Sequence, residues 1–439
     1  MTGGRQWLAL VAVALLAPAV HARQDWRTPA LASFDDVWRT VADTFYDPTF
    51  GGLDWNAVRA ELRPKAAEAE SPDAVRRVIV EMLGRLKRSH FVLLSSSSGS
   101  DDVLPGEATL PIDVRVLPAG VVITRVEGGS AAQRAGLAPG QMVVAVDGYA
   151  IPAGPDVAPG ADARAQALDL WRRVFRALHG TGGSVVELRV RDQDGLEKIV
   201  HVARVAESGE TVTLGNLPPL HVRVSAHAVE TPGRRRVGVI TFNIWMPAVD
   251  GLVGAAVDTF RHADGLVFDL RGNPGGLAGM IQGIAGHVLA EPALLGRMQT
   301  REGELKFAAN PRRATPDGRR VDPYAGPVAI LVDELTGSAS ECFAGALQSL
   351  GRARVFGRET MGQALPAVTK RLPSGDVLMY ALGDFVTGTG RRLEGEGVVP
   401  DQIIPLGPAE LAALSAGRDP VLEAAVRWLD GLAARLTGL

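Results

Sequence analysis

Ser338 is the residue whose surroundings in the sequence best suit covalent chemistry. It follows an apolar run at 328–332, typical of a buried strand, and a turn-forming segment at 333–337. Apolar residues then recur at three- and four-residue spacing, which predicts a helix. A serine at a strand-to-helix turn lies beside free N–H groups and the positive end of the helix dipole, which stabilise an oxyanion. Taken alone, the stretch is more typical of a helix N-cap, so the rest of the chain has to supply a base and further donors.

A nucleophilic serine needs a general base. Arginine stays protonated and cannot serve, and lysine occurs only at positions 65, 87, 198, 306 and 370. His90 directly follows Ser89 on a loop after a predicted helix. Further histidines lie inside a separate β-rich segment or on helices that flank a glycine loop: His179, His201, His262 and His287. The residue types alone leave this choice open.

The segment DLRGNPGG, residues 269–276, ends another predicted strand. Its glycines expose main-chain N–H groups at the edge of the sheet. We expect one oxyanion donor from Gly275 or Gly276 and the other from the N–H of Ala339, next to the serine. A glycine loop after a strand can also hold phosphate, but this one matches neither the P-loop nor the dinucleotide fingerprint.

Composition bounds the remaining possibilities. The 439 residues give room for two or three domains, and the net charge of -3 provides no basic surface for nucleic acid. Cys342 is the single cysteine, so neither an intramolecular disulfide nor a cysteine-based metal site is available. No metal and no cofactor are expected.

Residues 1–22 have the pattern of a cleavable signal peptide. Arg5 supplies the positive charge, residues 7–20 the apolar segment, and Val20-His21-Ala22 the small-residue cleavage site. The apolar segment is too short and too rich in alanine for a convincing membrane span. We therefore expect a periplasmic or secreted protein with no stable membrane span after cleavage. No cysteine lies near the site, which excludes a lipoprotein anchor.

The rest of the chain divides by pattern into four further segments. Helical spacing indicates an N-terminal helical domain at 23–100, which ends in a Ser- and Gly-rich link. Short strands with two helices indicate a small β-barrel at 101–206. Alternating strands and helices at 207–410 predict a layered α/β core, interrupted by an arginine-rich polar loop at 297–320. A C-terminal helix is expected at 411–439.

The barrel segment resembles a known family. VVITRVEGGSAAQRAGLAPGQMVVAVDG, within the barrel segment, is similar to PDZ domains of the type fused to bacterial proteases. This resemblance implies a carboxylate-binding loop near Leu110, Pro111, Ile112 and Asp113, where Pro111 departs from the usual glycine-rich form. A purely structural spacer domain is the alternative.

Three core motifs resemble the C-terminal processing (tail-specific) serine peptidases: DLRGNPGG, TGSASECFAGALQSLGRARVFGRETMGQA and EGEGVVPD. The resemblance implies a ClpP/crotonase-like layered α/β core. It also implies a nucleophile three residues before the acidic residue of the serine motif. That rule selects Ser338, with Glu341 as the acid and Ser340 as the second choice.

The base distinguishes two branches of that family. In the commoner branch a lysine after the serine helix is the base, but the matching position here is Gln363, which cannot titrate, and Lys370 lies in a different register. The other branch resembles tricorn protease and uses a Ser-His-Ser-Glu tetrad. Its Ser-His pair is matched by Ser89-His90, and its glutamate by Glu394, with Glu396 as second choice.

The resemblance implies an exported serine endopeptidase that acts on unfolded or C-terminal segments of proteins, with proteins or peptides as partners and homo-oligomerisation left open. With His90 as base, activity is expected to fall as the imidazole protonates near about 6.5. Two alternatives remain: a catalytically inactive, protease-like scaffold that binds peptides or ligands, and a crotonase-like acyl-transfer enzyme.

Overall fold

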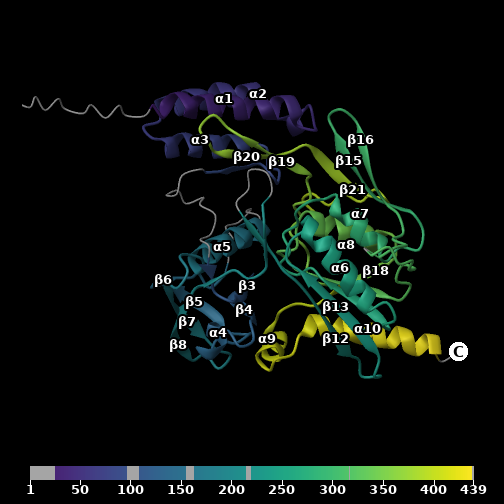
Figure 1. The fold of residues 1–439 in the computed structure, drawn as a ribbon. Helices are drawn as coiled ribbons and strands as arrows, with labels where there is room; N and C mark the ends of the chain where they lie inside the picture. Colours follow the sequence, from purple (N-terminus) through teal and green to yellow (C-terminus); the bar gives the residue numbers. More distant parts are fainter. Residues whose placement is uncertain (1–24, 96–107, 155–162, 214–218, 316, 438–439) are drawn as a thin grey trace, which may run out of the picture.

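The computed structural model describes residues 25–95, 108–154, 163–213, 219–315 and 317–437 (Figure 1). The expected signal peptide and most of the Ser- and Gly-rich link lie outside these residues. Within the described ranges, no helix is both long and apolar enough to cross a membrane. The chain forms a helical N-terminal part, a barrel-like part and a layered α/β core, so the predicted multi-domain α/β architecture is confirmed.

The N-terminal part consists of three helices packed around aromatic and aliphatic side chains. They are α1 (Arg27–Thr44), α2 (Trp55–Glu68) and α3 (Pro72–Gly84), with the 3₁₀ turn η1 (Phe50–Gly52) between the first two. The side chains of Asp54 and Ser71 accept hydrogen bonds from backbone N–H groups in the first turns of α2 and α3. The buried face of this part also contacts Leu372 and Leu378, so the helices are docked on the core (Figure 1).

The barrel-like part is a six-stranded sheet, in which β3-β4-β5-β7-β8 are neighbours in that order and the short β6 also pairs with β5; β3 and β8 are edge strands. Helix α5 packs against β3. The elements are β2 (Ala108–Thr109), β3 (Ile112–Leu117), β4 (Gly120–Val126), α4 (Ala131–Arg134), β5 (Met142–Val146), β6 (Tyr149–Ala150), α5 (Ala163–Leu178), β7 (Val185–Arg191), β8 (Glu197–Ala203) and β9 (Val205–Ala206). These short strands and the two helices α4 and α5 agree with the pattern that the sequence predicted for 101–206.

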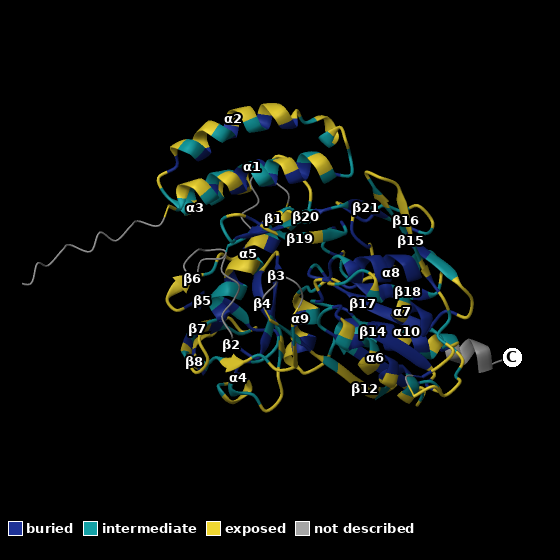
Figure 2. Ribbon diagram, turned by 45° about the horizontal axis from the view of Figure 1, so that its top comes forward, coloured by how far each residue is buried: buried dark blue, intermediate teal, exposed yellow. Residues whose placement is uncertain are grey.

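The core is a six-stranded sheet in which only β12 runs antiparallel to its neighbour. Its strands are β12 (Val224–Glu230), β13 (Arg236–Phe242), β14 (Gly265–Asp269), β17 (Val328–Val332), β18 (Ala353–Gly357) and β22 (Gln402–Ile403). Helices α6 (Pro247–Thr259), α7 (Met280–Gly286) and α8 (Ala339–Ser349) cover one face, and α10 (Pro420–Thr437) covers the other. Both faces are buried (Figure 2), which explains the continuous apolar runs of the parallel strands.

Smaller elements connect the three parts. A second sheet joins β16 (Glu304–Ala309), β15 (Ala293–Thr300) and β21 (Gly383–Thr387), and a third joins β1 (Val92–Leu94), β20 (Val377–Ala381) and β19 (Ala367–Arg371). The hairpin β10 (Glu210–Val212) and β11 (Leu220–Val222) follows the barrel-like part. Helix α9 (Pro408–Ser415) packs Leu411 and Leu414 against Leu117 and Val122 of the barrel-like part.

The prediction of a polar loop at 297–320 is wrong for its first half, residues 297–309. Residues 293–309 form the hairpin β15–β16, whose register with β21 is fixed by main-chain hydrogen bonds. Polar side chains lie on the outer face of this hairpin, while Leu295 and Ala309 are buried on the inner face.

Candidate active site

Ser338 lies at the turn between β17 and α8, as its flanking pattern predicted. Its φ of 51° and ψ of -119° are unusual for a residue with a Cβ, and such backbone strain persists only where neighbours enforce it. Its N–H donates to the carbonyl of Gln363 at 2.9 Å and to the carboxylate of Glu341 at 3.0 Å. The serine is therefore held in a strained position at the start of the helix.

Glu341 is the buried group that organises this turn. Besides the N–H of Ser338, its carboxylate accepts the N–H groups of Gly362 (2.7 Å) and Gln363 (2.9 Å) and the hydroxyl of Thr360. Burial raises the pKa of Glu341 to about 7, while these hydrogen bonds act in the opposite direction. Glu341 thus ties the serine turn to the segment at 360–363.

His90 belongs to a hydrogen-bonded relay with Ser89 and Glu394. The hydroxyl of Ser89 lies 2.7 Å from His90 Nδ1 and donates to Glu394 Oε2 at 2.8 Å. Glu394 Oε1 accepts the main-chain N–H of Ser89 at 2.9 Å. The buried carboxylate therefore fixes both the backbone and the side chain of Ser89.

This relay fixes the tautomer of the imidazole. Because the Ser89 proton is donated to a carboxylate, which only accepts, the Ser89 oxygen must accept from His90 Nδ1–H. The lone pair of a neutral His90 is then on Nε2, which has no hydrogen-bond partner within the described part of the chain. Burial lowers the pKa of His90 to about 4, which keeps the ring neutral at pH 7. A neutral ring with a free Nε2 is suited to accept a proton.

Long-range strand pairing places His90 there. Lys87 and His90 have positive φ values of 51° and 61°, so the short segment between α3 and β1 turns sharply. Strand β1 then pairs with β20, far along the chain. Arg76 of α3 also forms an ion pair at 3.0 Å with the buried Asp376. The N-terminal part thereby delivers the histidine to the core.

Glu394 connects the relay to the serine turn. Its Oε2 accepts the N–H of Ala364 at 3.0 Å, and the carbonyl of the preceding residue, Gln363, accepts the N–H of Ser338. His90 and Ser338 therefore lie in one continuous network. No direct hydrogen bond joins Ser338 Oγ to the imidazole of His90, both of which are described. Such catalytic contacts are often long in unliganded enzymes and tighten on substrate binding.

The glycine loop lies against the serine. A Cβ added to Gly275 would stand 2.5 Å from Ser338 Cβ and 2.9 Å from the nitrogen of Ala339. The N–H of Gly275, however, donates to the side-chain oxygen of Asn273 at 3.0 Å. The N–H groups of Gly276 and Ala339 make no hydrogen bond that the described part of the chain shows, and Ala339 begins α8. Gly276 and Ala339 thus have the available donors, and Gly275 permits the close approach.

We predict that Gly275→Ala will lower kcat by about 10² or more, because the new methyl group would collide with Ser338 and displace the oxyanion donors. Its φ of 105° adds strain of about 1–3 kcal/mol. Steady-state peptide hydrolysis and thermal unfolding measure the two effects. Gly279→Ala is the matched control, since its Cβ would meet open space and its φ is -59°. Equal activities of the two variants would contradict this role.

The alternative candidates for the nucleophile, the base and the glutamate lie outside this hydrogen-bond network. Ser340 is fully buried and accepts the indole N–H of Trp245 at 2.8 Å, so it is not an accessible nucleophile. Lys370 pairs with Asp36 at 2.8 Å, on the helical part. Glu396 is exposed, whereas Glu394 is buried in the relay. The histidines at 179, 201, 262 and 287 take no part in this network.

The predicted carboxylate-binding loop offers few donors. Pro111 has no N–H, and the N–H of Ile112 donates to the carbonyl of Leu110 at 2.8 Å. The carboxylate of Asp113 pairs with Arg125 at 2.7 Å and adds negative charge beside the loop. Capture of a peptide carboxylate at these four residues stays a prediction.

Two supporting groups escaped the sequence analysis. Buried Asn273 donates to the carbonyl of Phe242 at 2.8 Å while its oxygen accepts from Gly275, so it shapes the glycine loop. Arg115 of β3 forms a buried ion pair at 2.6 Å with Asp333, which also accepts the N–H of Gly272. The Asn-Pro-Gly-Gly run was a local signal for Asn273. No local signal pairs Arg115 with Asp333, since 218 positions separate them.

The lowered pKa of His90 changes the expected pH profile. We predict that kcat/KM will be kept as pH falls from neutrality to about 5 and will be lost near pH 4, where the ring protonates and can no longer accept a proton. This prediction replaces the expectation from the sequence that activity falls near pH 6.5. A pH–rate profile with half-maximal activity near 6.5 would contradict the burial of a neutral His90.

Stability has to be followed in the same experiment. Burial lowers the pKa of His287 to about 4 as well. Both pKa values lie below the unfolded value of about 6.5, so the unfolded chain binds more protons in this window. The stability contributed by the two neutral rings is complete above pH 6.5 and is lost as pH falls towards 4. Circular dichroism at each pH separates loss of the base from unfolding.

A layered α/β core that presents a serine at a strand-to-helix turn against a glycine loop, with a histidine relay tied to the same turn by hydrogen bonds, has the architecture of a serine hydrolase. Comparison with known proteins specifies the family. Residues 236–404 match peptidase family S41, and residues 30–84 match the tricorn protease C1 domain. The segment at 236–404 is therefore similar to a family of serine peptidases.

Two curated relatives illustrate the similarity. The carboxyl-terminal-processing protease of Picosynechococcus sp. is 26% identical over 404 residues, which cover 90% of this chain and 87% of that protein. A probable CtpA-like serine protease of Staphylococcus aureus is 28% identical over 287 residues, 65% of this chain and 50% of that protein. The chain thus corresponds to about half the length of the staphylococcal relative.

Solved structures share the fold. The photosystem II D1 C-terminal processing protease matches with a TM-score of 0.56 and 22% identity, over 87% of this chain and 94% of that one. Mature CPAF matches with a TM-score of 0.61 and 14% identity, over 92% and 96%. At these identities the likeness establishes the fold alone.

Proposed function

We propose that this protein is an exported serine endopeptidase that cleaves unfolded or C-terminal segments of proteins, with Ser338 as nucleophile and His90 as general base. One observation carries the proposal: the contacts of Ser89 with His90 and Glu394 leave the lone pair of His90 on a free Nε2. A Ser-His-Ser-Glu tetrad then supplies the base, because Gln363 occupies the position that holds lysine in the commoner branch of the family.

The mechanism follows from these groups. His90 Nε2 accepts the proton of Ser338 as the hydroxyl attacks a peptide carbonyl, and then protonates the leaving amine. Ser89 and Glu394 orient the ring and stabilise its positive charge. The N–H groups of Ala339 and Gly276 bind the oxyanion. Water then enters, and the same steps release the acyl group from the serine.

The proposed substrates and location rest on separate support. The relatives named as C-terminal processing proteases favour protein tails as substrates. The edge strand β3 of the barrel-like part offers a place for an extended peptide, in the manner of a PDZ domain. The pattern at 1–22 supports export to the periplasm or the medium.

The decisive experiment combines an active-site label with substrate turnover. A fluorophosphonate should modify the protein, and peptide mapping should find the label on Ser338. The protein should also cleave an unfolded polypeptide such as reduced casein. A labelled residue other than Ser338 would overturn the assignment, and peptide binding without labelling or cleavage would favour an inactive scaffold. Thioester turnover without peptide cleavage would favour acyl transfer.

A further inference from the structure

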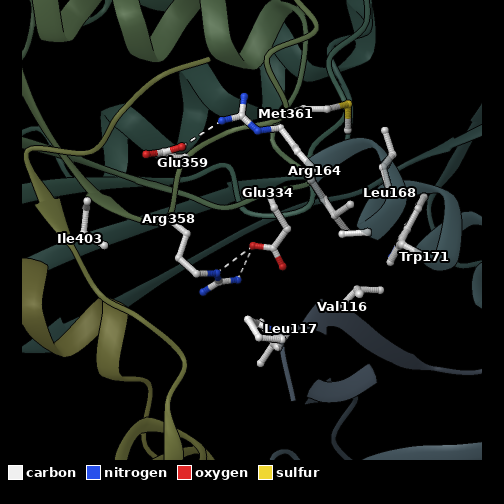
Figure 3. A pocket seen from close by; sticks show the side chains of 13 residues that line it. Val116, Leu117, Arg164, Leu168, Trp171, Glu334, Arg358, Glu359, Met361 and Ile403 are labelled. Atoms are coloured by element: carbon white, nitrogen blue, oxygen red, sulfur yellow. Dashed lines mark hydrogen bonds and ion pairs between the residues drawn. The ribbon is translucent and has the colours of Figure 1, made fainter. Parts of the chain in front are cut away.

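A cavity of about 340 Å³ lies between the barrel-like part and the core (Figure 3). The end of β3 and the first half of α5 form one side. The serine turn and the segment at 358–361 form the other. Its walls are mostly apolar and include Leu117, Leu168, Trp171, Leu335 and Met361. This volume is at the small end of the range for ligand pockets, so it suits one large side chain.

The charged groups around the cavity are already paired with one another. Arg358 binds Glu334 through Oε2, with contacts of 2.7 and 2.8 Å, and Arg164 binds Glu359 at 2.9 Å. The charges therefore cancel. A bound cation would remain without a counterion in an apolar setting, which is costly. A neutral side chain is favoured.

The wall of the cavity also contains a buried carboxylate oxygen. Glu334 Oε1 is buried, and no described residue forms a hydrogen bond with it. In Figure 3 this oxygen points away from Arg358, on the side of Val116 and Leu117. A buried acceptor without a partner is costly, and a ligand that brings an O–H or N–H donor would satisfy it.

The cavity also adjoins the serine. Glu334 and Leu335 belong to the turn that ends at Ser338, and Met361 packs close to Gly337, where an added Cβ would lie 3.1 Å from its sulfur. Strand β3 has one edge without a partner strand among the described elements, and an extended peptide can pair there with alternate side chains turned to one face. A substrate segment along β3 would place one side chain in the cavity.

We propose that this cavity is a specificity subsite for an aromatic side chain with a neutral donor, in the first place tyrosine. The inference rests on the proposed peptidase function and deepens it. The ring of the substrate fills the apolar space beside Trp171 and Leu168, and its hydroxyl donates to Glu334 Oε1. Phenylalanine fits the same space but leaves the oxygen without a partner.

The test uses peptide pairs that differ by one oxygen atom. Matched peptides carry tyrosine, phenylalanine or lysine at each position on either side of the cleaved bond, and kcat/KM is measured for each. We expect tyrosine to exceed phenylalanine by about 10- to 100-fold at one position, the value of a hydrogen bond to a charged acceptor. Lysine should not exceed tyrosine there, because the cavity has no free counterion.

The Glu334→Gln variant tests whether Glu334 Oε1 causes the preference for tyrosine over phenylalanine. Arg358 has only donors, so it will hold the amide oxygen and turn the NH₂ group, which cannot accept, towards the cavity. The tyrosine-to-phenylalanine ratio should fall to about 1–3. Glu302→Gln, on the exposed β15–β16 turn, removes the same charge and should keep the wild-type ratio. A ratio unchanged by Glu334→Gln would overturn the subsite.

A second variant covers the case in which Glu334→Gln does not fold. Ala167→Leu adds volume to the wall formed by α5 and should lower kcat/KM for tyrosine and phenylalanine peptides relative to an alanine peptide. Equal rates for all three peptides would count against the cavity.

If the wild type cleaves no peptide at all, the peptidase function itself fails. If it cleaves peptides but prefers lysine, or does not distinguish tyrosine from phenylalanine at any position, only the subsite fails.

Discussion

Ser338→Ala is expected to abolish peptide cleavage, with kcat lowered by about 10⁴–10⁶. The alanine keeps the Cβ and the strained backbone of the turn, so the loss reports the hydroxyl and not the fold. The main-chain contacts of residue 338 with Gln363 and Glu341 do not involve the side chain and should persist. Peptide hydrolysis and fluorophosphonate labelling measure the effect, and both should disappear together.

Ser340→Ala is the matched control for this prediction. It removes a hydroxyl two residues away that is buried and bonded to Trp245. We expect a loss of about 1 kcal/mol in the free energy of unfolding and little change in kcat. Cleavage retained by Ser338→Ala, or lost equally in both variants, would show that another group is the nucleophile.

His90→Gln is expected to have the second-largest effect, a decrease in kcat of about 10⁴. Glutamine is polar and of similar reach, but it does not titrate and cannot remove the serine proton. Combining it with Ser338→Ala should add little further loss, because the two groups act in one step. Steady-state kinetics of the single and double variants test this directly.

The relay predicts graded effects around that histidine. Ser89→Ala and Glu394→Gln should each reduce kcat by less than His90→Gln, since they orient the ring without taking the proton themselves. His262→Gln is the control, because His262 is exposed at the end of α6. Near-normal kcat in folded His90→Gln would exclude His90 as the general base. The identity of the base would then be open again, as it was from the residue types alone.

The site was predictable from the sequence to the extent that its signals are local. The apolar run, the turn and the helical spacing around Ser338 lie within about twenty residues, so periodicity places them correctly. The motif DLRGNPGG predicted a loop with exposed N–H groups for the same reason. The resemblance to the tail-specific peptidases placed Gln363 where the commoner branch has its lysine, and this difference directed attention to His90.

What the sequence determined by itself is thus the strand-turn-helix that presents the serine and the glycine loop that follows β14. Tertiary structure decided the rest. It places Glu394, and not the exposed Glu396, in hydrogen-bond contact with Ser89, 305 positions away in the chain, where β1 pairs with β20. It also left the N–H groups of Gly276 and Ala339 without a hydrogen bond in the described part of the chain and paired Arg115 with Asp333. It folded the first part of the arginine-rich segment into a hairpin and placed Glu334 between the barrel-like part and the core. Each of these depends on contacts between distant segments, whose register and burial leave no periodic trace in the local sequence.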